Sequence, residues 1–411
     1  MGAVAARARA PFALPLALAS ALLGCATTSY ERDLALATAA VSAGDASLDR
    51  AADSLAARVE TLPPGAPEKA LLLLELGSLE LRRGDLTAAA ARLEVADPLL
   101  DVVDLTKDPE GELSSWLFAD AARPYRAPAY EKLMVNLLGM ASRAATRDWR
   151  GALVEARRFA VVMRYLRDVE GLDAGGLERL AQALSAAVHE AAGRDGEARR
   201  LSVEARGETF DPKAPPAALP AEGGQGELVV VVLSGVLPRR VAQRVSVEEA
   251  ARRARSPGTA KSLRQQGVSE LDLVTLAGAS GATEPVVTLD GAPAALLRAD
   301  VEALARATFE QAAPTLAQAA LTRAMTRSAV EGGVKGAGGS RGGTVQLASF
   351  VGALMRGSDV PDTRAWTTLP AKVALLRVGL APGAHVVTVG DEAREVAVEA
   401  GRVHVEVVVT R

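Results

Sequence analysis

The sequence is poor in cysteine, histidine and aromatic residues, and each shortage argues against a class of chemistry. One cysteine among 411 residues cannot form an internal disulfide. The only histidines are His189, His385 and His404, with no His-x-x-x-His pair and no cysteine partner, which argues against a zinc site of the usual kind. Aromatic residues make up 3% of the chain, too few for extended stacking platforms. We therefore expect no metal and no cofactor.

The charge balance is close to neutral, with a formal net charge of −3. A nucleic-acid-binding domain usually carries a clear excess of lysine and arginine, and no part of this chain has one. Apolar runs long enough to cross a membrane are also missing after the first two dozen residues. The sequence therefore predicts neither a nucleic-acid partner nor a second membrane segment.

The N-terminus has the pattern of a secretory signal. Arg7 and Arg9 precede a short apolar stretch over residues 11–24 that ends in a small residue. The stretch is too short, and too interrupted by proline, to span a bilayer as a mature helix. Its removal would leave 45 basic and 50 acidic residues in the mature chain.

The end of this stretch and the next residue, Leu22-Leu23-Gly24-Cys25, resemble the lipobox of bacterial lipoproteins. This resemblance implies cleavage before Cys25 and lipid attached to its thiol, which anchors the protein to a membrane. Ala26 stands where an aspartate would imply retention in the inner membrane, so the resemblance implies the outer membrane, facing the periplasm. The alternative is an ordinary signal peptide followed by an incidental cysteine.

From residue 33 to 210 the pattern is helical and rich in alanine. The run Leu71–Leu81 is apolar nearly all round, which predicts a buried helix, and a turn at Gly84-Asp85 leads to a second helix that should end by Pro98. This pair resembles a tetratricopeptide repeat, in which small residues such as Gly77 let paired helices approach. A looser copy runs through Leu138-Gly139 and a weaker one through 177–205. We expect a tetratricopeptide-like helical repeat domain.

A Pro/Gly-rich linker at 211–226 separates this region from a different pattern. Leu228–Leu233 is a continuous apolar run, as in a central strand buried on both faces. Strands are also expected near 271–276 and 286–289, followed by a helix from Val301 that Pro314 should kink or break. Four alternating segments between 372 and 409 predict an antiparallel β meander at the C-terminus.

One tract matches a catalytic motif. Gly338-Gly339-Ser340-Arg341-Gly342 fits the pattern G-x-S-x-G, and Asp359 or Asp362 and then His385 or His404 follow in hydrolase order. A nucleophile elbow requires a strand before the serine, whereas here a helix precedes a glycine-rich stretch. We therefore interpret residues 332–343 as a flexible hinge and assign no catalytic residue. An envelope hydrolase or wall-modifying enzyme that uses the Ser340 region is the alternative.

A second pattern suggests a binding surface. Arg150, Arg157 and Arg164 recur every seven residues and so share one side of a predicted helix, with Arg158 beside them. The simplest interpretation is a solvated outer face. The alternative is a basic stripe that meets an acidic partner, anionic lipid headgroups or peptidoglycan carboxylates.

The whole arrangement resembles a family of uncharacterised bacterial lipoproteins with a lipobox, tetratricopeptide-like helices and a C-terminal α/β region. The residues that carry the resemblance are 226–230, 363–370 and 380–385. It implies an envelope assembly role rather than an activity. We expect a multidomain α plus α/β protein that acts as a non-catalytic scaffold for an envelope protein. The predicted divisions are a signal peptide at 1–24, a tether at 25–32, the helical domain at 33–210, the linker at 211–226 and a mixed α/β domain at 227–411.

Overall fold

The computed structural model describes residues 25–105, 124–215, 218–278, 281–337 and 361–410. The predicted signal peptide lies outside these residues. In the described residues, helices dominate up to residue 205, and strands with a second group of helices follow. The coarse prediction of a mixed α plus α/β protein is confirmed.

The N-terminal region is a row of helices, most of them in pairs joined by short turns. They are α2 (Cys25–Ala43), α3 (Asp45–Thr61), α4 (Lys69–Arg82), α5 (Leu86–Leu105), α7 (Ala129–Ala145), α8 (Trp149–Glu170), α9 (Gly175–Ala191) and α10 (Asp195–Ala205). Helix α4 is buried from Ala70 to Leu81, as its all-round apolar pattern predicts. The stretch predicted as a tether is helical and belongs to α2.

The predicted end of α5 at Pro98 is wrong, because the helix continues past it to Leu105. Proline removes one backbone donor from a helix interior and disfavours the preceding turn. Packing offsets that cost here, since Leu100, just beyond the proline, is buried in the main core.

Two glycines permit the close helix approach expected from the sequence. A Cβ atom on Gly77 of α4 would lie 3.3 Å from the Leu93 side chain of α5, and one on Gly139 of α7 would lie 3.4 Å from the Glu155 side chain of α8. Small residues at these positions therefore set the spacing within both helix pairs.

The main sheet has the strand order β10-β1-β7-β6, with β1 in its centre. Its strands are β1 (Gly226–Ser234), β6 (Leu297–Asp300), β7 (Lys372–Leu380) and β10 (Val403–Val409). Every residue of β1 is buried, which confirms the predicted central strand. A smaller sheet has the order β5-β4-β8-β9, from β4 (Val287–Leu289), β5 (Ala292–Pro293), β8 (Gly383–Val389) and β9 (Glu392–Val398).

The predicted C-terminal meander is wrong, although all four of its strands exist. Strands β7 and β10 flank β1, with β10 parallel to it, while β8 and β9 form a hairpin in the other sheet. The reason is that β1 is apolar on both faces and can be buried only with a hydrogen-bonded neighbour on each edge.

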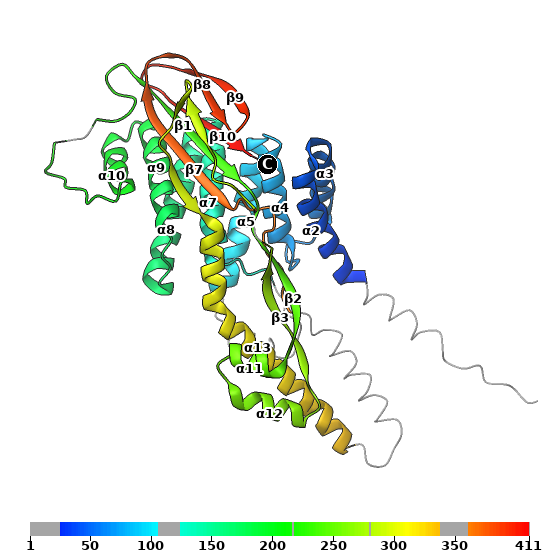
Figure 1. Cartoon of the computed structure of the whole chain (residues 1–411). Coiled ribbons are helices and arrows are strands. Elements are labelled where there is room, and N and C mark those ends of the chain that lie inside the picture. The colour runs from blue at the N-terminus through cyan, green and yellow to red at the C-terminus, as the bar shows by residue number, and fades with distance from the viewer. Residues whose placement is uncertain (1–24, 106–123, 216–217, 279–280, 338–360, 411) are drawn as a thin grey trace, which may run out of the picture.

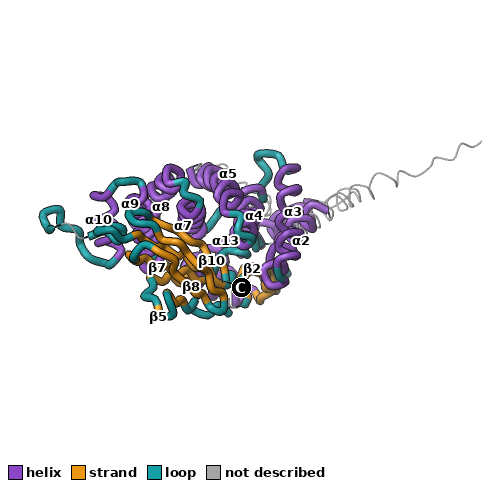
Figure 2. The backbone as a smooth tube through the Cα atoms, turned by 90° about the horizontal axis from the view of Figure 1, so that it is seen from above, coloured by secondary structure: helices purple, strands orange, loops and turns teal. Residues whose placement is uncertain are grey.

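The body of the molecule has three layers: the helices, the main sheet and the smaller sheet (Figure 2). Val229, Val231 and Leu233 of β1 pack in one core with the helices. The alternate residues Leu228, Val230 and Val232 pack in a second core with the smaller sheet. Period-two alternation in β1 thus joins the helical and α/β regions through a shared core.

A separate arm extends from this body (Figure 1). It consists of β2 (Arg239–Ser246), β3 (Glu270–Ala277), α11 (Val247–Arg253), α12 (Pro257–Gln265) and the outer part of α13 (Val301–Ala337). The arm has its own small core, formed by residues of α11, α12, β3 and α13.

Helix α13 continues through Pro314 without ending. It also includes the first glycines of the tract predicted as a hinge, and its 37 residues span about 55 Å. Neither α13 nor any other helix in the described part of the chain is both long enough and apolar enough to cross a membrane.

Replacing Gly176 with alanine is expected to destabilise the contact between α9 and the sheet. The added Cβ would lie 2.5 Å from the carbonyl oxygen of Arg298 in β6, so the backbone must shift. We expect a loss of about 1–3 kcal/mol in the free energy of unfolding, measured by urea denaturation. Gly196→Ala in α10 is the matched control, since its Cβ meets nothing within 4 Å and the change should stabilise the protein by about 0.5–1 kcal/mol. Equal effects of the two substitutions would contradict this account.

Candidate functional site

The inner face of the helical layer is occupied by the protein's own chain. Residues 364–370, here called the return segment, come after the arm and before β7 in the sequence. They lie within the body and form hydrogen bonds with α4 and α7. Glu75 of α4, fully buried, accepts bonds from the backbone N–H groups of Thr367 (2.6 Å) and Thr368 (3.1 Å). It also accepts bonds from both threonine hydroxyls, at 2.8 and 2.5 Å. Burial raises the pKa of Glu75 to about 7.

Trp366 is the apolar anchor of the return segment. Its side chain is buried, its Nε1 donates to Ser78 Oγ at 2.7 Å and its backbone N–H donates to Glu131 Oε1 at 3.2 Å. The second oxygen of Glu131 accepts a 2.5 Å bond from the Tyr125 hydroxyl. Helices α4 and α7 are therefore already engaged on their inner side.

A second buried cluster ties β7 and β1 to α9 and α10. The Arg377 guanidinium contacts Glu227 of β1, Glu190 of α9 (2.8 Å) and Ser202 Oγ (2.6 Å). Burial raises the pKa of Glu227 to about 8, and its Oε2 has no hydrogen-bond partner among the described residues. These groups lie inside the packed body, so they hold the layers together and are not open to a ligand.

The arginines singled out in the sequence lie on α8, at the outer side of the helical layer. The helix begins after Asp148, whose carboxylate accepts a 2.9 Å bond from Gly151 N–H. Arg150, Arg157 and Arg164 are exposed, and none forms an ion pair with another described residue. Arg158 is different, because it turns inward and contacts Asp97 (3.1 Å) and Glu155 (3.4 Å). The structure thus separates the predicted stripe into three open arginines and one engaged arginine.

Apolar side chains lie exposed between these arginines. Val161 is 67% exposed and Tyr165 54%, and Val154 lies one heptad before Val161 on the same side. Together with Arg157 and Arg164 they form what we call the α8 face. The apolar part of this face was not predicted from the sequence, although the signal was present: these three residues fall outside the apolar stripe that faces the core.

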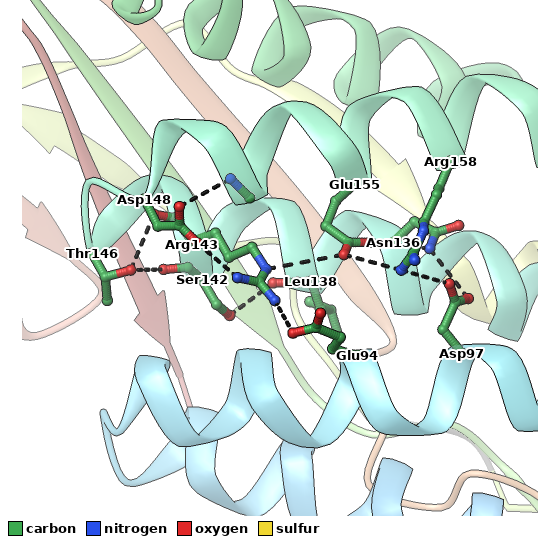
Figure 3. A network of polar contacts seen from close by, with 11 residues as sticks. Glu94, Asp97, Asn136, Leu138, Ser142, Arg143, Thr146, Asp148, Glu155 and Arg158 are labelled. Carbon is green, nitrogen blue, oxygen red and sulfur yellow. Dashed lines mark hydrogen bonds and ion pairs between the residues drawn. The ribbon is translucent and has the colours of Figure 1, made fainter.

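A hollow of about 290 Å³ opens beside the α8 face, between α5 and α8. It is lined by Asp97, Pro98, Asn136, Arg157, Arg158, Val161 and Val162. Behind it lies a polar network that links α5, α7 and α8 (Figure 3). Asn136 Nδ2 donates to Glu155 Oε2 at 3.2 Å and to Asp97 Oδ1 at 3.4 Å. Burial raises the pKa of Glu155, whose side chain fits against Gly139.

The acceptor oxygen of Asn136 is unused. The residue is fully buried, and Oδ1 has no hydrogen-bond partner among the described residues. A buried amide oxygen without a partner costs about 1–3 kcal/mol of desolvation. Asn136 lines the hollow, so the unused acceptor belongs to a residue of its wall.

The alternative catalytic site is not assembled by the described residues. Ser340 and Asp359 lie outside them, and Asp362 contacts Arg364 at 2.8 Å. His385 has both ring nitrogens engaged, Nδ1 with Asp290 (2.7 Å) and Nε2 with the Ala381 carbonyl oxygen (2.9 Å). His404 Nε2 lies 2.9 Å from Glu406. Among the described residues, no group of three or more His, Cys, Asp or Glu side chains is placed to hold a metal ion.

Comparison of the chain with protein families, with curated proteins and with solved structures finds no match. The α8 face and its hollow are therefore identified by their geometry alone. They combine arginines without an ion-pair partner among the described residues, exposed apolar side chains, and a buried acceptor that is unused in the described part of the chain.

Proposed function

We propose that the protein is a lipoprotein, anchored through Cys25 to the outer membrane and facing the periplasm, that acts as a non-catalytic scaffold for another envelope protein. The observation that carries the proposal is the α8 face. Val161 and Tyr165 are exposed there beside arginines that have no carboxylate partner among the described residues. Exposed apolar side chains next to unpaired charges are typical of protein-binding surfaces.

The helix pairs α4/α5, α7/α8 and α9/α10 support a tetratricopeptide-like interpretation of the N-terminal region. Such repeats usually bind a partner on their inner face. Here the return segment and the main sheet fill that face, through contacts such as those of Glu75 with Thr367 and Thr368. The docking surface of this scaffold is therefore the outer one, on α8.

The chemistry of the α8 face specifies its partner. Val154, Val161 and Tyr165 follow helical spacing, so they match an apolar stripe on a second helix. Arg157 and Arg164 flank that stripe and match carboxylates of the partner. The proposed occupant is an amphipathic helix of a protein, with acidic residues bordering its apolar side.

Reversing the charge of this face should weaken binding of such a helix. We expect an acidic amphipathic peptide of leucine and glutamate to bind the wild-type protein at least about tenfold more tightly than the Arg157→Glu/Arg164→Glu variant, because like charges replace attractive ones. Fluorescence anisotropy of the labelled peptide measures the difference. A peptide with lysine at each glutamate position should bind the wild type weakly and the variant better.

The matched control is Arg255→Glu/Lys261→Glu, which makes the same charge change at two exposed positions of the arm, between α11 and α12 and within α12. Equal peptide binding by the two double variants would reject the α8 face as the docking surface. In cells, crosslinking and capture of the full chain on a C-terminal tag should enrich an envelope protein from the wild type and the control. The reversed variant and Cys25→Ala should both lose it, the first through the surface and the second through the anchor.

A further inference from the structure

Part of the wall of the α5–α8 hollow is apolar. Pro98, Val161 and Val162 line it, and Val161 at its rim is largely exposed to solvent. At about 290 Å³, the hollow is just below the range of small-molecule pockets. Its size and walls therefore suit one large side chain of a docked partner.

The charges around the hollow are mixed and largely neutralise one another. Asp97 and Arg158 contact each other at 3.1 Å, and Glu155 lies 3.4 Å from Arg158. A bound anion would meet the carboxylate of Asp97, and a bound cation would meet Arg157 and Arg158. A neutral group is therefore favoured over either ion.

The polar requirement of the hollow is a single donor. Asn136 lines it, is fully buried and has an Oδ1 without a partner, while its Nδ2 is already bonded to Glu155 and Asp97. A neutral group with an apolar body and one N–H or O–H donor satisfies this acceptor. Among protein side chains, tryptophan and tyrosine have this combination.

We propose that the hollow receives one tryptophan or tyrosine side chain of the docked partner, with its N–H or O–H donating to Asn136 Oδ1. The ring lies against Pro98, Val161 and Val162, and the Arg157 guanidinium at the rim contacts its π face. This inference rests on the proposed function, because the partner that supplies the ring is the helix docked on the α8 face. The hollow supplies the specificity that charge alone does not.

Indole and benzofuran test the donor. The two molecules have nearly the same size and shape, but only indole has an N–H. We expect indole to bind at least about fivefold more tightly than benzofuran, the ratio for one hydrogen bond of about 1 kcal/mol. The measurement is an NMR titration that follows the methyl signals of Val161 and Val162 in the full chain. Equal binding of the two molecules, or no binding of indole, would overturn the proposal.

Filling the hollow tests the location. Val161→Trp places a ring of the protein's own at the rim, so indole binding should fall at least about tenfold. Val169→Trp is the matched control, because Val169 is equally exposed at 66% on the same helix and does not line the hollow. Both positions are open to solvent, so neither variant should lose its fold. Unchanged indole affinity in Val161→Trp would place the binding elsewhere and reject the proposal.

The two proposals fail in different experiments. The indole titration uses no partner, so it measures the hollow even if the α8 face binds no helix. Peptide binding that does not respond to Arg157→Glu/Arg164→Glu rejects the proposed function. Indole binding that does not distinguish indole from benzofuran rejects only the assignment of the hollow.

Discussion

Replacing Arg377 with methionine is expected to lower the free energy of unfolding by about 3–5 kcal/mol. The guanidinium lies between Glu227, which is fully buried, and Glu190, whose side chain is 7% exposed. Without it, two carboxyl groups remain buried side by side with no cation between them. Urea denaturation followed by circular dichroism measures the loss.

A second substitution should rescue much of this loss. Glu227→Leu in the Arg377→Met background replaces the uncompensated carboxyl group with an apolar side chain of similar size. Glu190 keeps its bond from Ala221 N–H. Arg402→Met is the surface control, since Arg402 is 70% exposed, and should change stability by less than about 0.5 kcal/mol. If Arg377→Met were as stable as that control, the cluster would have no structural role.

Replacing Glu75 with alanine is expected to cost about 4–5 kcal/mol, among the largest effects of a single substitution. The change removes four acceptor contacts and leaves the backbone N–H groups of Thr367 and Thr368 buried without partners. It also leaves a space between α4 and the return segment. Chemical denaturation again provides the measurement, with Glu60→Ala at an exposed site of α3 as the control. A cost below 1 kcal/mol would show that the return segment docks without this carboxyl group.

The same carboxyl group predicts the sign of a pH effect. Burial raises the pKa of Glu75 from 4.5 in the unfolded chain to about 7 in the folded protein. Between these values the folded state binds more protons, so this group's contribution is full below pH 4.5 and is lost as the pH rises through 7. The contribution amounts to about 3 kcal/mol. We expect the stability difference between wild type and Glu75→Gln to shrink by that order from pH 4.5 to 7.5, and a difference independent of pH would contradict the raised pKa.

The sequence predicted those parts of the fold whose burial can be inferred from the residues of one segment alone. Leu71–Leu81 is apolar nearly all round and Leu228–Leu233 is apolar on both faces, so burial of both was expected. The order of the strands in the two sheets could not be predicted, because the alternating valines in 383–389 and 403–409 fit either sheet equally well until the neighbouring strands are known. Helices α11 and α12 are short, and their burial depends on α13, which comes much later in the chain.

The candidate site was predicted only in part, for a related reason. The heptad spacing of Arg150, Arg157 and Arg164 placed them on one side of α8. The hollow could not be foreseen, because it depends on Asn136 and Asp97 from two other helices meeting behind Arg158. Glu75 stood within a helix otherwise apolar all round, which is a signal for a buried acceptor. Nothing in Thr367-Thr368 alone identifies the donors, since threonine pairs are ordinary in loops.

Strand β1 has a consequence for the order in which the chain can fold. Its two neighbours, β7 and β10, begin at residues 372 and 403, so the whole arm is inserted between β1 and the strands that cover its edges. During synthesis, β1 and the apolar inner side of the helices have no sheet to pack against until those strands emerge. Contacts between segments this distant in sequence form slowly. A chain of this design is suited to being held unfolded by a chaperone, and truncation before residue 403 should yield aggregation-prone protein rather than a smaller folded one.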